Sequence, residues 1–297
     1  MYVVVGASGK TGTAVMEALL ARGLPARAVV RRAEQAEAWR ARGAEAALAD
    51  LANEDALVQA FGGARSAYLM NPPAYGEADM FARARQVHAA LVAAAERAGV
   101  GRIVALSSVG AQHAEGTGNI LTTHDLERRL AGCTCPVTVL RAANFVENWG
   151  WVLQPARERG VLPSMFLPVG RKLPMQSTTD VGGTATALML EGGPDRRLVE
   201  LHGPEDYSPE DAAAVLTDLL GHPVAAAAVP EEAWTGTFRA QGFPERTVQG
   251  FCEMFRGFNT GHIAFEGTGE TRRGTATLRQ ALARVAGPAN TRAQAWG

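Results

Sequence analysis

The stretch Met1-Tyr-Val-Val-Val-Gly-Ala-Ser-Gly-Lys-Thr-Gly12 decides the fold of this chain. A β-branched apolar run ends at the first glycine, and two more glycines follow at intervals of three. This pattern predicts a buried strand, a tight turn and the start of a helix. The first glycine suits the turn, the second lets a phosphate approach the backbone, and the third lets helix and strand pack closely. Because a helix start offers free N–H groups to anions, we expect a dinucleotide here, bound by Gly6, Ser8, Gly9, Lys10, Thr11 and Gly12.

Two other glycine-containing loops do not fit this stretch. A phosphate loop of the NTPase type needs a glycine five residues before Gly9, and position 4 is Val. The hydrolase loop Gly-x-Ser-x-Gly needs a glycine at position 10, which is Lys. The dinucleotide interpretation is the one that remains.

Composition excludes several classes of protein. The 297 residues include 29 basic and 30 acidic side chains, so nothing indicates a nucleic-acid partner. No apolar run reaches about 18 residues, and a strand is expected from residue 2, so we expect no signal peptide and no membrane partner. The three cysteines lack metal-ligand spacing, which favours a reducing, cytoplasmic location without a metal site. Monomer and homodimer both fit the sequence.

Short apolar strands alternate with helical patterns through the first half of the chain. This alternation predicts an α/β fold with a Rossmann-type doubly wound parallel sheet, covered by helices on both faces. The expected strands are 2–5, 26–30, 45–49, 66–70, 102–107 and 136–140. The expected helices are 10–22, 33–42, 53–61, 78–98 and 122–131.

Beyond residue 150 the spacing loosens, which predicts a second, smaller and mainly helical region. Residues 1–150 form the expected dinucleotide-binding domain, to which one strand returns from about 172–202; the candidates are 172–177 and 197–201. Residues 151–171 and 203–286 form the expected substrate-binding cap, with helices at 208–220, 231–240, 245–256 and 275–285. Residues 287–297 are polar and aperiodic, so we expect a flexible tail.

The second strand indicates which dinucleotide is bound. An acidic residue at its end favours NAD, whereas arginine accommodates the 2′-phosphate of NADP. Because Arg31 and Arg32 follow this strand, NADP(H) is preferred, and Glu34 keeps NAD(H) possible. After the third strand, Asp50 and Leu51 are expected to contact the adenine, although Asp50 also suits the cap of the next helix. After the fourth strand, Asn71 and Pro72 begin a rigid loop at the expected binding edge.

Together these features resemble the NmrA-like branch of the atypical short-chain dehydrogenase/reductases. The resemblance implies a Rossmann domain with a small substrate domain, NADP(H) across the strand ends, and reduction of quinones, carbonyls or alkenes. The branch also includes regulators that sense the redox state of the cofactor. The matching segments are Val5-Gly-Ala-Ser-Gly-Lys-Thr-Gly12, Asp50-Leu51, Asn71-Pro72-Pro73, Ile103-Val-Ala-Leu-Ser-Ser-Val-Gly110, the His124 to Glu127 helix, Leu140-Arg-Ala-Ala-Asn-Phe-Val-Glu-Asn148 and Thr179-Asp180-Val181.

The chain departs from this family at two positions. Members usually carry a proline shortly after the arginine of the sixth strand, where this chain has Ala142-Ala143. Some relatives have Lys or His four residues before the helical Glu, where this chain has Thr123.

The usual proton-transfer pair of short-chain dehydrogenases, Tyr-x-x-x-Lys, is absent. His124 is therefore the expected proton donor, because imidazole titrates near neutral pH and the residue follows the fifth strand. Glu127, one turn later, is positioned to hydrogen-bond the imidazole or the backbone. Ser107 is expected to contact a substrate carbonyl or the cofactor ribose, and Asn144 the nicotinamide carboxamide.

Three functions fit these features. The first is an NADPH-dependent oxidoreductase that reduces a carbonyl, quinone or activated alkene of a small hydrophobic substrate. The second is a non-catalytic NADP(H)-sensing regulator, favoured by the missing Tyr-x-x-x-Lys pair. The third is a non-redox isomerase or lyase on the same fold. Aromatic residues of the expected cap favour a hydrophobic ligand, although such residues more often fill a core; they are Trp234, Phe238, Phe251 and Phe255.

Overall fold

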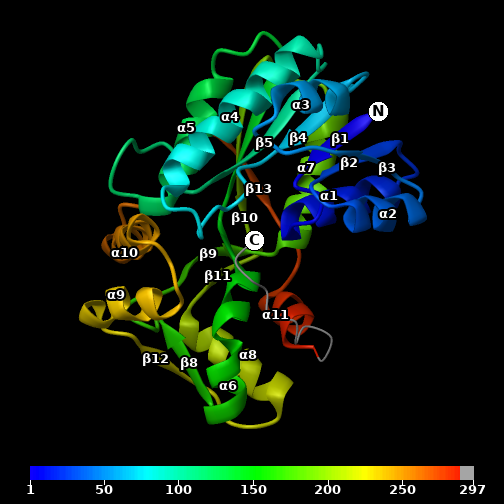
Figure 1. The fold of residues 1–297 in the computed structure, drawn as a ribbon. Coiled ribbons are helices and arrows are strands. Elements are labelled where there is room, and N and C mark those ends of the chain that lie inside the picture. The colour runs from blue at the N-terminus through cyan, green and yellow to red at the C-terminus, as the bar shows by residue number, and fades with distance from the viewer. Residues whose placement is uncertain (288–297) are drawn as a thin grey trace.

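A computed structural model describes residues 1–287 (Figure 1). Its main sheet has eight strands in the order β13-β10-β6-β5-β4-β1-β2-β3, and every neighbouring pair is parallel. This arrangement confirms the predicted Rossmann-type α/β fold. The strands are β1 Tyr2–Val5, β2 Ala26–Val30, β3 Glu45–Leu48, β4 Ser66–Leu69, β5 Ile103–Ser108, β6 Val137–Ala142, β10 Arg196–His202 and β13 Glu270–Arg273.

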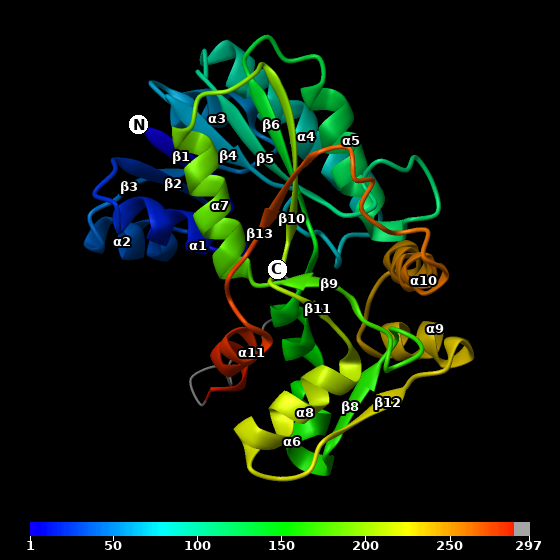
Figure 2. The same ribbon diagram turned by 180° about the vertical axis from the view of Figure 1, so that it is seen from behind.

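Helices cover both faces of this sheet. One face carries α1 Lys10–Leu20, α2 Ala33–Ala41 and α7 Thr178–Leu190, the last of which crosses the sheet in Figure 2. The other face carries α3 Glu54–Phe61, α4 Met80–Arg97 and α5 Leu121–Leu130.

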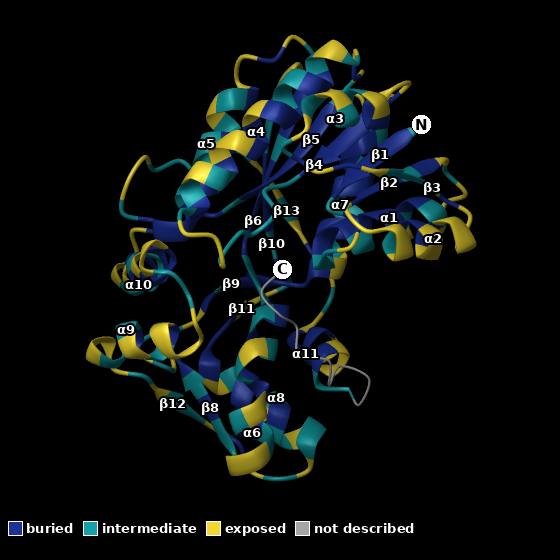
Figure 3. Cartoon of the chain, in the orientation of Figure 1, coloured by how far each residue is buried: buried dark blue, intermediate teal, exposed yellow. Residues whose placement is uncertain are grey.

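The apolar run of β1 is continuous because its side chains pack into two apolar cores, one on each face of the sheet. Val4 packs in the core beneath α1 and α7, whereas Val3 and Val5 pack in the core beneath α3 and α4. All three are fully buried, as the dark blue centre of Figure 3 shows. Burial of one such side chain contributes about 1.5–3 kcal/mol.

Two strands from the second half of the chain join the main sheet, which corrects the prediction of one. β10, at 197–201 in the sequence prediction, pairs with β6, and β13 pairs with β10. The other candidate, 172–177, forms β9 Leu173–Gln176 in a small sheet with β7 Asn144–Phe145 and β11 Asp206–Tyr207. In this small sheet β9 is the central strand, and Pro174 lies opposite Asp206 of β11. The sequence of β13 is Glu-Thr-Arg-Arg, so its edge strand has no apolar pattern to detect.

The remaining elements pack into three further apolar clusters, the largest of which includes Leu153, Leu216 and Leu282. Of these elements, α6, α8, α9, α11, β8 and β12 lie below the main sheet in Figure 1. The division into a cofactor domain and a cap stays a prediction, and residues 288–297 of the predicted tail lie outside the described residues. Within residues 1–287, none of the helices combines the length and apolar character that crossing a membrane requires. The elements that remain beside the main sheet, its covering helices and the small sheet of β7, β9 and β11 are η1 Gly118–Ile120, η2 Val146–Val152, α6 Leu153–Arg159, β8 Val161–Ser164, α8 Pro209–Leu220, β12 Ala225–Ala228, α9 Glu231–Ala240, α10 Glu245–Thr260 and α11 Leu278–Ala286.

Candidate functional site

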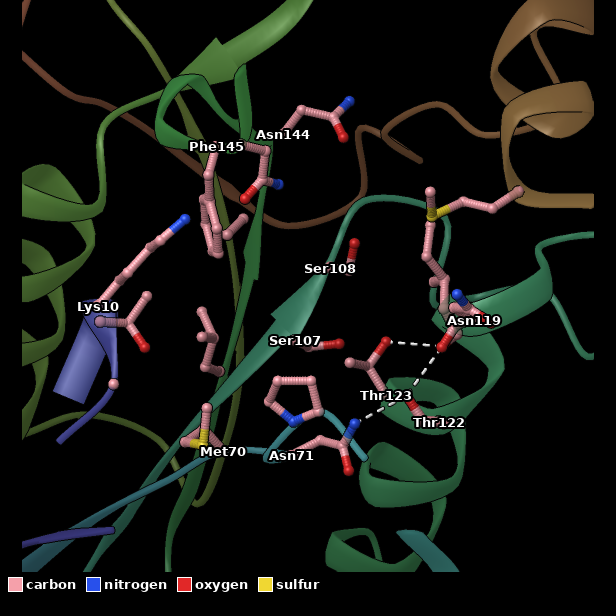
Figure 4. Close-up of a pocket in the computed structure, with 18 of the residues that line it drawn as sticks. Lys10, Met70, Asn71, Ser107, Ser108, Asn119, Thr122, Thr123, Asn144 and Phe145 are labelled. Carbon is pink, nitrogen blue, oxygen red and sulfur yellow. Dashed lines mark hydrogen bonds between the residues drawn. The ribbon is translucent and has the colours of Figure 1, made fainter. Parts of the chain in front are cut away.

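A pocket of about 500 Å³ lies where β1, β4, β5 and β6 end. Ligands of open α/β sheets bind at this carboxyl edge. Figure 4 shows Lys10 and Phe145 on one side of the pocket, Thr122 and Thr123 on the other, and Ser107 between them. The lining residues are Ser8, Gly9, Lys10, Thr11, Met70, Asn71, Pro73, Tyr75, Leu106, Ser107, Ser108, Asn119, Ile120, Thr122, Thr123, Ala142, Ala143, Asn144, Phe145, Asn148, Trp151, Phe251 and Met254.

The glycine loop forms one end of the pocket and has the expected geometry. Gly6 has φ of +68°, a conformation that favours glycine, and Gly9 N donates to Gly6 O at 2.9 Å. A Cβ on Gly12 would lie 2.1 Å from Gly6 O, so helix α1 packs directly against the turn. Thr13 and Trp39 both donate to Ala7 O, at 3.0 and 3.2 Å, which holds the loop in place.

The first turn of α1 is open to an anion. Its N-cap, Gly9, offers no side chain to accept from the free N–H groups, and the first turn contains no acidic residue. The loop of β1 and the start of α1 therefore provide main-chain donors at the pocket, as phosphate binding requires.

Lys10 links this loop to the segment after β7. Its Nζ donates to Glu147 O at 3.3 Å and lies 5.5 Å from the centre of the Trp151 ring. Burial lowers the pKa of Lys10, and the Glu147 carboxylate opposes that effect. Lys10 is the lysine among the residues that line the pocket, and no arginine of residues 1–287 lines it, so its ammonium group supplies the positive charge of the pocket wall.

Asn144 has an amide donor without a hydrogen-bond partner in the structure. Its Nδ2 is buried in the pocket wall and has no hydrogen-bond partner. Such a group costs free energy unless a ligand or a water completes it. The open N–H groups of α1 and this amide together fit a dinucleotide lying across the strand ends.

Asn71 is held by a chain of hydrogen-bonded side chains behind the pocket. His88 is fully buried; its Nδ1 lies 2.8 Å from Asp125 Oδ2 and its Nε2 lies 2.9 Å from Asn71 Oδ1. Asn71 Nδ2 donates to Thr122 Oγ1 at 2.9 Å (Figure 4). Burial lowers the pKa of His88, while its hydrogen bond to the Asp125 carboxylate acts in the opposite direction. These contacts fix the orientation of the Asn71 amide at the pocket.

Ser107 is held by a second buried unit. Its Oγ donates to Glu127 Oε1 at 2.5 Å. Arg141 donates to both carboxylate oxygens of Glu127, at 3.0 and 2.7 Å, and is itself 7% exposed. Glu127 thus bonds to Ser107 and Arg141, where the sequence had suggested the imidazole of His124 or the backbone.

Several predicted cofactor residues lie outside the pocket lining. Arg31 and Arg32 are exposed at the start of α2, and Leu51 is buried. Asp50 accepts from Ala52 N at 3.0 Å and pairs with Arg83 at 2.9 Å. The cap of α3 is Asn53 rather than Asp50, since its side chain accepts from Ala56 N. The pocket reaches Pro73 rather than Pro72, and roles for all these residues in binding adenosine stay predictions.

His124 does not line the pocket. Its Nδ1 lies 2.8 Å from Ala111 O, so the ring is engaged with the loop after β5. Its neighbour Thr123 occupies the lining position and donates to Ile120 O at 2.8 Å. A catalytic role for His124 therefore requires a rearrangement of this loop or a connection through another group.

The opposite end of the pocket is apolar, with Phe251 and Met254 contributed by α10. Phe251 lies in a buried cluster with Trp234 and Phe238, so most of the predicted cap aromatics fill a core and one also borders the pocket. Tyr75 packs against Phe251 with ring centres 4.9 Å apart, and burial raises the pKa of Tyr75 to about 12. Sequence reasoning missed Tyr75 because it lies in an irregular loop, where no periodicity marks a lining position.

The fold and the pocket define a Rossmann-type protein with a site at the carboxyl ends of its parallel strands. The model of the NmrA-like family matches residues 2–276, and the chain belongs to this family. The resemblance inferred from the sequence is thereby confirmed.

Individual proteins of known activity resemble the chain over most of its length. An NAD(P)H azoreductase from Xenophilus azovorans is 27% identical over 258 residues, which is 86% of each protein. The structure of an NADPH-dependent quinone oxidoreductase from Escherichia coli in complex with NADPH superposes with a TM-score of 0.78, at 24% identity over 96% of this chain and 99% of that one. A triphenylmethane reductase from Citrobacter sp. gives the same TM-score at 20% identity, with the same shares covered. The two structures show a common fold.

Proposed function

We propose that the chain is an NADPH-dependent oxidoreductase that reduces a carbonyl, quinone or activated alkene of a small hydrophobic substrate. One observation carries the proposal: a single pocket joins the open glycine loop at Ser8–Thr11 to an apolar end at Phe251 and Met254. A cofactor and a hydrophobic acceptor would thus share one cavity. The azoreductase and quinone reductase relatives support the same type of chemistry.

The cofactor end of the pocket suits NADP(H). The nicotinamide supplies the hydride when bound. The main-chain N–H groups of the loop and the ammonium of Lys10 would neutralise the phosphates. The Nδ2 of Asn144, which has no hydrogen-bond partner in the structure, would donate to the carboxamide of the nicotinamide. Arg31 is proposed to contact the 2′-phosphate, since its exposed guanidinium follows β2.

The substrate end offers a proton donor. Of the side chains that line the pocket, Lys10 and Tyr75 are the ionisable ones. A tyrosine phenol keeps its proton at neutral pH, and burial raises the pKa of Tyr75 further, to about 12. Tyr75 lies beside Phe251, at the apolar end, so we propose that it donates to the reduced substrate. His124 remains the alternative donor if its loop moves.

A cofactor-sensing regulator is the second candidate. The missing Tyr-x-x-x-Lys pair favours it, because a sensor needs cofactor binding without proton transfer. The apolar end of the pocket favours the enzyme, because a sensor has no need of a substrate cavity beside the cofactor.

The deciding experiment follows NADPH oxidation at the nicotinamide absorbance, with a panel of quinones, enones, carbonyl compounds and azo dyes. We expect turnover that saturates with at least one electron-poor aromatic acceptor. Tight NADPH binding without turnover of any acceptor would indicate the regulator. An isomerase or lyase would convert its substrate with no net change in NADPH.

A further inference from the structure

Ser107 occupies a fixed position in the pocket wall. It is 4% exposed at the end of β5, and its one hydroxyl contacts Glu127 Oε1 at 2.5 Å. Glu127 comes from α5, and Arg141 comes from β6, the neighbouring strand. Side chains from three elements therefore form one unit behind the pocket.

The charges in this unit set the direction of the hydrogen bond. Arginine stays protonated in proteins, and Arg141 meets Glu127 through two parallel N–H···O contacts. Glu127 thus faces Arg141 as the carboxylate of an ion pair, with Arg141 Nη2 2.7 Å from Glu127 Oε2. An ionised carboxylate can only accept, so the proton of Ser107 lies in the bond to Glu127.

The second acidic partner of Arg141 strengthens this polarity. Arg141 also donates to Glu266 Oε2 at 2.9 Å, so one guanidinium faces two carboxylates. Arg141 therefore pairs with two carboxylates, and Glu127 is the one that also contacts Ser107. A hydroxyl has one proton and two lone pairs. Ser107 consequently offers its lone pairs to a ligand in the pocket and acts there as a hydrogen-bond acceptor.

We propose that Ser107 accepts a hydrogen bond from a ribose hydroxyl of the bound dinucleotide, and that Glu127 and Arg141 are positioning residues that impose this polarity. The inference rests on the proposed function. An oxidised carbonyl, quinone or alkene substrate carries no hydroxyl to donate, whereas each ribose of a dinucleotide does. Ser107 would thus serve the cofactor and would not polarise a substrate carbonyl, which is the other role its position suggested.

The test measures NADPH binding by fluorescence titration without substrate. Ser107→Ala removes the acceptor and leaves the Glu127–Arg141 pair intact, so we expect the Kd for NADPH to rise about tenfold. Ser66→Ala is the matched control, because Ser66 is a buried serine of β4 whose Oγ has no hydrogen-bond partner. The control should bind NADPH as the wild type does. Thermal unfolding of each variant verifies that it is folded.

A double-mutant cycle tests the positioning role. Glu127→Gln replaces the carboxylate by an amide, whose N–H would face Arg141 or Ser107 and so disturb the hydrogen bond of the serine. When it is the only substitution, it should weaken NADPH binding about fivefold. It should have no further effect in the Ser107→Ala background, because Glu127 acts through the serine. Equal losses in both backgrounds would overturn the positioning role, since a merely structural effect would add.

The failures of the two proposals are distinguishable. Wild-type NADPH binding together with an unchanged Kd for Ser107→Ala would overturn the inference and leave the proposed oxidoreductase standing. No NADPH binding by the wild type would overturn the proposed function and the inference with it.

Discussion

Two alanine substitutions in the glycine loop separate the packing role of a glycine from its ligand role. In Gly12→Ala, the new Cβ would lie 2.1 Å from Gly6 O and 2.6 Å from Gly6 C. Both are main-chain atoms of the turn, so the start of α1 must move by more than about 1 Å to restore an ordinary contact of 3.4 Å. Overpacking of this kind costs about 1–3 kcal/mol. We expect the free energy of unfolding to fall by that amount.

Gly9→Ala should leave the fold intact and reduce cofactor affinity. Gly9 has φ of −88° and ψ of 170°, which any residue adopts, and the nearest atom to an added Cβ is Gly6 O at 3.4 Å. Stability should therefore change by less than about 0.5 kcal/mol. The methyl group would stand beside the open N–H groups of α1. Loss of one charge-assisted hydrogen bond to a phosphate, worth about 1.5–3 kcal/mol, raises the Kd for NADPH at least tenfold.

Urea unfolding and NADPH fluorescence titration measure the two effects side by side. Gly183→Ala in α7 is the control, because an added Cβ there has no neighbour within 4 Å. It should raise stability by about 0.5–1 kcal/mol through helix propensity and leave the Kd for NADPH unchanged. Wild-type affinity in a folded Gly9→Ala protein would refute the placement of phosphate at this loop.

Four further substitutions test the cofactor and proton assignments. Arg31→Ala should raise the Kd for NADPH about tenfold and leave that for NADH within twofold; an unchanged NADPH affinity would contradict the 2′-phosphate contact. Burial lowers the pKa of Lys10 from its ordinary value of 10.5, so the ammonium loses its proton at a lower pH than a free lysine does. NADPH affinity of the wild type should therefore fall as pH rises toward 10.5. Lys10→Gln should bind NADPH more weakly at neutral pH and lack this alkaline decline, and an equal decline in the variant would contradict the phosphate contact of Lys10. Tyr75→Phe should reduce turnover about 100-fold, and His124→Ala only a few-fold, because Tyr75 lines the pocket; a larger loss for His124→Ala would reassign the proton donor.

The sequence predicted the first six strands to within two residues because each is a short apolar run between turn residues. It predicted the glycine loop for a stronger reason, since the positive φ of Gly6 and the close approach at Gly12 exclude other residues. It missed β13 because Glu270–Arg273 joins the sheet edge through main-chain pairing to β10, and its side chains are largely exposed. Edge strands held by backbone hydrogen bonds leave little pattern in composition.

The direction of the hydrogen bond made by Ser107 could not be predicted from the sequence, for a different reason. Ser107, Glu127 and Arg141 each stood in a recognisable segment, but whether a serine donates or accepts depends on what meets its proton. Glu127 is 20 residues from Ser107, and the register of β5 on β6 places Arg141 directly opposite that serine. This register brings the Arg141 guanidinium to the same carboxylate that Ser107 contacts. The proposed role of Ser107 therefore depends on the pairing of two strands, which explains why motif spacing alone left both a substrate carbonyl and the cofactor ribose open as its partner.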